Sequence, residues 1–151
     1  MAMDFYLEVD TALEQHPFSD EFFRGVSQVI EDPDEDGEML VRAPNFLASV
    51  YEITSARKAF ARFLSIDPKF HIYFFNITSS ETLNGYHEIL KVVIAWLSKT
   101  NDDLALIAEE GQVLILRKSG QIVRHDRKNW WADDDLKIFS LPHLVKQLPI
   151  V

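Results

Sequence analysis

The stretch between residues 104 and 123 constrains the fold most strongly, because three short apolar runs alternate with two turns. The runs occupy residues 104–108, 113–116 and 121–123, and the turns are Glu110-Gly111 and Ser119-Gly120. Glycine readily adopts the positive φ angles that tight hairpin turns require. The segment therefore predicts a three-stranded antiparallel meander.

A strand and a long helix are expected just before this meander. Residues 70–77 are aromatic or β-branched almost throughout, which is typical of a buried strand. Thr78 and Glu81 have the spacing of a helix capping box. The pattern predicts that the longest helix of the chain begins there and ends near Lys99.

The N-terminal half predicts a strand, a helix and further strands. Residues 3–9 alternate, with Phe5, Leu7 and Val9 on one face and Tyr6 and Glu8 on the other. Ser19 is a suitable N-cap for an amphipathic helix of about three turns reaching residue 30. Residues 39–41 and 48–53 are typical of strands, whereas residues 56–64 fit either a helix or a strand, with strand or irregular structure favoured.

This order of elements predicts an α+β fold. We expect a mainly antiparallel sheet with two helices on one face, in a ferredoxin-like variant with a C-terminal β-meander. A chain of 151 residues without an internal repeat or a flexible linker favours a single domain over residues 1–151.

Composition excludes several functional classes. The chain has no Cys, which rules out disulfides, zinc–thiolate sites, iron–sulfur clusters and thiol catalysis. A net charge of −9 argues against binding to nucleic acid or to an anionic membrane, since both require a cationic surface. With no secretory signal and no apolar stretch of membrane-spanning length, the expected location is the cytoplasm.

The negative charge is concentrated in the first third of the chain. Residues 1–56 hold 13 Asp and Glu but only two Arg, a net charge of −11, whereas residues 57–151 have a net charge of +2. Six acids lie within the eight residues from Glu31 to Glu38, where Pro33 and Gly37 interrupt regular structure. This segment predicts an acidic loop.

Three interpretations of the acidic loop remain open. Asp32, Asp34, Asp36 and Gly37 match the first half of an EF-hand calcium loop, but position twelve is Ala43 instead of the usual Glu. A solvated loop without a ligand explains the same residues. The third interpretation is a docking surface for a basic protein, because concentrated acids accelerate association with a cationic partner.

Two tryptophans followed by acids form a second candidate site. An exposed Trp rimmed by charge is typical of protein interfaces. The alternative is that a Trp closes the edge of the core while the acids cap the next element. The residues of this cluster are Trp130, Trp131, Asp133, Asp134 and Asp135.

No catalytic or cofactor motif stands out. The five His residues lack the spacing of metal ligands, and the five Gly residues are too scattered for a phosphate-binding loop. There is also no nucleophile elbow. We therefore expect a protein that is not an enzyme and has no metal or cofactor.

The order of several segments resembles the Sit-type immunity proteins of bacterial swarming-inhibition toxin systems. The resemblance rests on five segments: Asp4-Phe5-Tyr6-Leu7-Glu8, residues 57–76, Val93-Ile94-Ala95-Trp96-Leu97, Asp102-Asp103-Leu104-Ala105-Leu106, and residues 113–123 followed by Trp130 or Trp131. It implies a non-enzymatic cytosolic protein that neutralises a cognate toxin by binding it.

The expected docking face consists of the acidic loop, with Trp130 or Trp131 as an aromatic anchor. The toxin would then carry a basic surface. The alternatives are a calcium- or small-ligand-binding domain and an adaptor domain. The loop residues assigned to binding are Asp32, Asp34, Glu35, Asp36 and Glu38.

Overall fold

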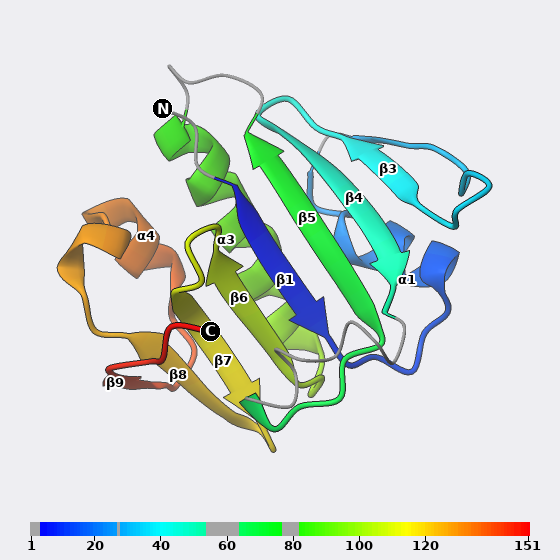
Figure 1. Cartoon of the computed structure of the whole chain (residues 1–151). Helices are drawn as coiled ribbons and strands as arrows, with labels where there is room; N and C mark the ends of the chain where they lie inside the picture. Colours follow the sequence, from blue (N-terminus) through cyan, green and yellow to red (C-terminus); the bar gives the residue numbers. More distant parts are fainter. Residues whose placement is uncertain (1–3, 27, 54–63, 77–81) are drawn as a thin grey trace.

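A nine-stranded sheet organises the chain in the computed structural model, which describes residues 4–26, 28–53, 64–76 and 82–151 (Figure 1). Its strand order is β2-β3-β4-β5-β1-β6-β7-β8-β9. All neighbouring strands are antiparallel except β8 and β9, which are parallel. The strands are β1 (Phe5–Val9), β2 (Val29–Ile30), β3 (Met39–Arg42), β4 (Phe46–Glu52), β5 (Phe70–Asn76), β6 (Leu104–Ala108), β7 (Val113–Lys118), β8 (Gln121–His125) and β9 (Leu144–Lys146).

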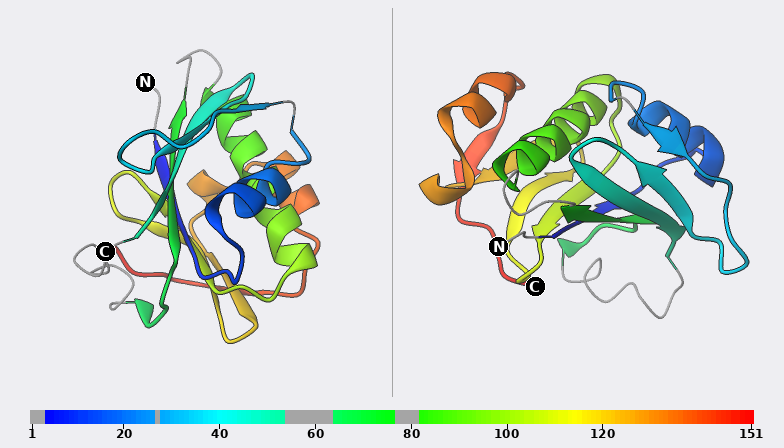
Figure 2. Two further views of the ribbon diagram at one scale, coloured as in Figure 1. Left: turned by 90° about the vertical axis from the view of Figure 1, so that its right-hand side faces the viewer. Right: turned by 90° about the horizontal axis from the view of Figure 1, so that it is seen from above.

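The helices whose bounds lie in the described part of the chain cover one face of the sheet, as Figure 2 shows from the side and from above. They are α1 (Gln15–Phe22), α3 (Thr82–Lys99), the 3-10 helix η3 (Lys128–Trp130) and α4 (Asp133–Ile138). The succession β1-α1-β4-β5-α3-β6, with the spatial order β4-β5-β1-β6, has the ferredoxin-like arrangement. The predicted α+β class is confirmed, and α4 adds a third helix to the same face.

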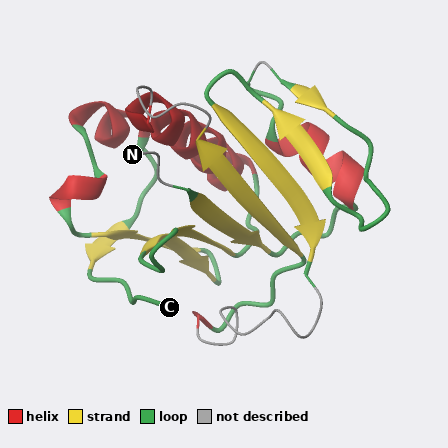
Figure 3. Ribbon diagram, turned by 45° about the horizontal axis from the view of Figure 1, so that its top comes forward, coloured by secondary structure: helices red, strands yellow, loops and turns green. Residues whose placement is uncertain are grey.

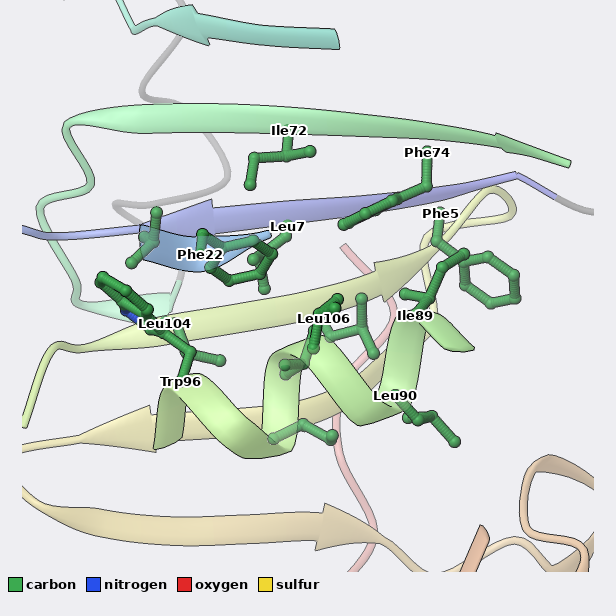
Figure 4. Close-up of a cluster of buried hydrophobic side chains, with 14 of the residues drawn as sticks. Phe5, Leu7, Phe22, Ile72, Phe74, Ile89, Leu90, Trp96, Leu104 and Leu106 are labelled. Atoms are coloured by element: carbon green, nitrogen blue, oxygen red, sulfur yellow. The ribbon is translucent and has the colours of Figure 1, made fainter. Parts of the chain in front are cut away.

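Apolar side chains of the central strands pack against α3 to form the core (Figure 4). Phe5 and Leu7 of β1 point towards the helices, as the alternation in the sequence predicted. On α3, Trp96 is 2% exposed and donates its indole N–H to Asp102 Oδ2 at 3.0 Å. Burial raises the pKa of the Asp102 carboxyl, and this hydrogen bond opposes the rise.

The helix predicted from Ser19 to about residue 30 is wrong in its position. Helix α1 begins at Gln15, and Ser19 lies inside it, where its Oγ donates to the Gln15 carbonyl at 2.9 Å. Pro17 sits in the first turn, where the absence of its N–H costs no helical hydrogen bond. Residues 29–30 belong to β2 instead, which pairs with β3.

Other local predictions are confirmed. The meander is β6-β7-β8, and residues 39–41 and 48–53 fall largely within β3 and β4. Two predictions lie outside the described residues. They are the capping box at Thr78 and Glu81 and, except for Leu64, the choice between helix and strand for residues 56–64. The sequence did not predict β9, which joins the sheet beside β8 (Figure 3).

Candidate functional site

Polar and aromatic side chains from β4, β5 and β1 share the face of the sheet opposite the helices. Strand register places Tyr51 opposite His71, and His71 opposite Glu8. One step along the sheet, Tyr73 lies opposite Tyr6. Because side chains alternate along a strand and the neighbouring residues point into the core, these five project from the open face, which is towards the viewer in Figure 1.

The aromatic rings of this face contact one another. The ring centroids of Tyr51 and His71 are 5.0 Å apart, those of Tyr6 and His71 5.4 Å, and those of Tyr6 and Tyr73 4.8 Å. Tyr73 also contacts Phe75, which is 38% exposed, with 4.1 Å between the centroids. The face is therefore a continuous aromatic surface that remains partly open to solvent.

Tyr73 is held as a neutral phenol. Its hydroxyl donates to Asp4 Oδ2 at 2.8 Å. Burial, together with this hydrogen bond and the charge of Asp4, raises the pKa of Tyr73 well above its ordinary value. At neutral pH the ring therefore offers an uncharged aromatic surface.

A cavity of about 380 Å³, which we call the tyrosine cavity, opens between these strands and the β6–β7 turn. Glu8 is 1% exposed, and its Oε1 lies 3.4 Å from His71 Nδ1. Glu8 Oε2 and His71 Nε2 have no hydrogen-bond partner among the described residues. The lining residues are Tyr6, Glu8, Tyr51, His71, Tyr73, Ile107, Glu109, Glu110, Gly111 and Val151.

The acidic loop borders a second cavity that adjoins the first. The two cavities share Tyr51 and Tyr73, and none of the described residues that line them is Lys or Arg. We call their combined lining the acidic–tyrosine face. The second cavity is lined by Gln15, Asp36, Gly37, Glu38, Ser49, Tyr51, Glu52, Tyr73 and Phe75.

Internal hydrogen bonds fix the conformation of the acidic loop. Asp34 Oδ1 accepts from the amides of Asp36 at 2.9 Å and Glu38 at 3.0 Å, and Gly37 has a φ of +80°. Glu38 Oε1 accepts from the Ser49 hydroxyl at 2.6 Å. The Gln15 amide group of α1 donates to the Gly37 carbonyl at 2.6 Å, which ties the loop to the body of the protein.

The loop does not assemble a metal site. Over the described parts of the chain, no group of three or more His, Asp or Glu side chains is placed to hold a metal ion. Asp34 would be the second ligand of the EF-hand pattern, but one of its oxygens already accepts two backbone hydrogen bonds.

Most carboxylates of the acidic loop are exposed to solvent, as expected of an acidic loop. Asp32, Asp34, Glu35 and Asp36 are exposed, and Glu38 is half-buried. Of these, Asp36 and Glu38 border the acidic–tyrosine face. Their part in binding a partner stays a prediction.

The expectation of an exposed tryptophan is wrong for both candidates. Trp130 is 9% exposed and packs against Phe5 and Tyr86, with ring centroids 6.4 and 6.3 Å away. Trp131 is 5% exposed and contacts Phe139. Both indoles complete the core beside α4, because a large apolar ring has a lower free energy when it is buried than when it is exposed to water.

The three acids that follow the tryptophans have different environments. Asp135 is buried: its Oδ1 lies 2.7 Å from His87 Nδ1 on α3, and its Oδ2 accepts from the Ala132 amide at 3.0 Å. It therefore anchors α4 and is not available to a partner. Asp133 and Asp134 are exposed in the first turn of α4, and their role in binding stays a prediction.

The two predicted acidic groups do not form one surface. The acidic loop lies at the β2–β3 end of the sheet, whereas α4 lies at the β8 end (Figure 1). The loop and the two tryptophans therefore lie at opposite ends of the sheet, and a docking face that combines them stays a prediction.

Sequence analysis did not single out Tyr6, Glu8, Tyr51, His71 and Tyr73. The available signal was the alternation itself, since Tyr6 and Glu8 were expected on the face of their strand away from the core. That these strands are neighbours depends on long-range pairing, which the local pattern does not contain.

Comparison with known proteins gives one match. A protein-family model described as SitI3-like matches residues 3–135. No curated protein and no solved structure matches the chain. No helix in the described ranges has both the length and the apolarity needed to cross a membrane.

Proposed function

Because the chain belongs to the SitI3-like family, a family of immunity-type proteins, we propose that it binds and neutralises a cognate toxin protein. The acidic–tyrosine face is the surface that docks. Binding occurs in the cytoplasm of the producing cell and needs no catalysis by the immunity protein.

One observation carries the choice of surface: a continuous face of tyrosines and carboxylates that, among the described residues, no Lys or Arg interrupts. Tyrosine is enriched at protein interfaces because it contributes a large contact area at a small entropic cost. Carboxylates on one face steer a basic partner towards it and raise the association rate. The toxin therefore has a basic surface that complements this face.

The chemistry of the tyrosine cavity supports binding over catalysis. Glu8 and His71 form the kind of pair that activates a hydroxyl or thiol nucleophile, but among the described residues no Ser, Thr, Cys or Lys lines that cavity. The same pair, placed among aromatic rings, is suited to holding a donor from another molecule.

The test is a charge reversal on the rigid loop. The variant Asp32→Lys/Asp36→Lys changes two exposed carboxylates and leaves Asp34 and Glu38 to maintain the loop. With the cognate toxin, stopped-flow association should slow by about tenfold or more, and its dependence on salt should flatten.

The matched control is Asp133→Lys/Asp134→Lys, which changes the same amount of charge at the opposite end of the sheet. Its association rate should differ from that of the unaltered chain by less than about threefold. If the control slows association and the loop variant does not, the acidic–tyrosine face is not the docking surface. If the unaltered chain does not bind the toxin, the proposed function is wrong.

A further inference from the structure

Glu8 is a buried carboxylate whose second oxygen finds no donor among the described residues. The residue is 1% exposed, and Oε2 has no hydrogen-bond partner among the described residues, although Oε1 lies near His71. Leaving a buried carboxylate oxygen unpaired costs free energy, so such a group calls for a donor from a bound water, an ion or a ligand. Because Glu8 lines the tyrosine cavity, a donor from another molecule would reach it through that cavity.

The rings around Glu8 favour a cationic donor. Tyr6 and Tyr51 flank His71, with centroid distances of 5.4 and 5.0 Å. Aromatic faces carry partial negative charge and attract ammonium and guanidinium groups. Glu109 and Glu110 add negative charge to the lining, and none of its described residues is Lys or Arg.

The size of the cavity indicates a single long side chain. Its volume of about 380 Å³ is at the lower end of the range for ligand sites, and it opens onto the proposed docking face. An arginine fits better than a lysine, because its planar guanidinium can stack on a tyrosine ring while donating to a carboxylate.

We propose that the tyrosine cavity receives one arginine side chain of the toxin, whose guanidinium donates to Glu8 Oε2 and stacks on the surrounding tyrosines. This inference rests on the proposed function and specifies its central contact. Arginine insertion at the centre of a charged rim is the arrangement expected of an interface hot spot.

The first test uses small probes on the complete chain, without the toxin. N-acetyl-arginine amide should shift the backbone amide NMR signals of Tyr6, Glu8, His71 and Gly111 in the millimolar range. N-acetyl-citrulline amide, which has nearly the same shape without the charge, should bind at least about tenfold more weakly. Equal binding of the two probes overturns the proposal, and so does equal binding of N-acetyl-lysine amide.

The second test uses the variant Glu8→Gln, which preserves shape and removes charge. It should weaken binding of the arginine probe by about tenfold or more, whereas Asp134→Asn, which removes one exposed charge from α4 outside the cavity, should change it by less than about threefold. Thermal unfolding of each variant checks that the fold is retained. If Glu8→Gln does not fold, Tyr51→Leu replaces it as the test variant, since loss of an aromatic ring should also weaken binding of the arginine probe.

The toxin experiment separates this inference from the proposed function. If the toxin binds Glu8→Gln as tightly as the unaltered chain, the arginine contact is wrong while the immunity role stands. If the arginine probe binds but the toxin does not, the cavity is a cation site and the proposed function fails.

Discussion

Trp131 donates its indole N–H to the backbone carbonyl of His125 at 2.8 Å. This bond joins the end of β8 to the segment that leads into α4. The guanidinium of Arg124 lies 5.2 Å from the centroid of the same indole, and Phe139 contacts its edge. Trp131 therefore stabilises the fold at this end of the sheet and does not present a contact surface.

Replacing Trp131 should lower stability without affecting toxin binding. Trp131→Phe leaves the buried His125 carbonyl without its donor and removes part of a buried ring, which should cost about 1–3 kcal/mol of unfolding free energy. Urea unfolding measures this loss, and the exposed change Lys137→Ala should cost less than about 0.5 kcal/mol. Unchanged stability combined with lost toxin binding would contradict the structural role.

His125 should make the protein less stable at acid pH. The side chain is 2% exposed, and its Nδ1 accepts from the Leu148 amide at 3.0 Å, so protonation would break that bond. Burial lowers the pKa of His125 below its ordinary value of 6.5. The unfolded chain therefore takes up a proton near pH 6.5, whereas the folded chain takes it up only at lower pH.

The stability contributed by this neutral histidine is consequently present above about pH 6.5 and falls as the pH decreases, by at most about 1.4 kcal/mol per pH unit. Urea unfolding between pH 7.5 and pH 5 measures the slope. His125→Asn places an uncharged acceptor near the position of Nδ1, so subtracting its profile isolates the histidine. Identical slopes for the two proteins would show that His125 does not contribute.

Arg117 should be essential for closing the C-terminal end of α3. Its guanidinium donates to the Leu97 carbonyl at 2.8 Å, to the Asp102 carbonyl at 2.7 Å and to Thr100 Oγ1 at 3.1 Å. Arg117→Met would leave these acceptors unsatisfied and should lower the free energy of unfolding by about 2–4 kcal/mol. The unfolding free energy of Arg117→Lys should lie between those of the unaltered chain and Arg117→Met, because an ammonium cannot reach all three acceptors.

Gly111 and Gly120 provide a matched pair for the two turns of the meander. Both have positive φ, +98° and +82°, but a Cβ at Gly111 would lie 2.5 Å from the Val151 oxygen, whereas Gly120 has open space around it. Gly120→Ala should lower the free energy of unfolding by about 1 kcal/mol. Gly111→Ala should lower it by at least about 1 kcal/mol more. Urea unfolding measures both losses. Equal losses would show that the C-terminal residue Val151 moves aside without strain.

The elements predicted correctly are those whose signals are local. The meander follows from apolar runs and glycine turns, and β1 and β5 follow from alternation and β-branched or aromatic content. The predicted start of α1 is wrong because it rests on Ser19 as the N-cap. Pro17 is also a local helix signal, since proline is tolerated in a first turn, and it indicates the observed start. Strand β9 has too short a pattern to be recognised, and its pairing with β8 is a long-range event.

By itself, the sequence determined the α+β class, the meander, the acidic loop and the uneven distribution of charge, because periodicity, turn residues and charge are properties of neighbouring residues. Only the tertiary structure decided which charged and aromatic groups meet. It buried Trp130, Trp131 and Asp135, since large rings and paired carboxylates are stabilised in the core. It also aligned Tyr51, His71 and Glu8 across three strands, because pairing between strands distant in sequence sets the register of the open face.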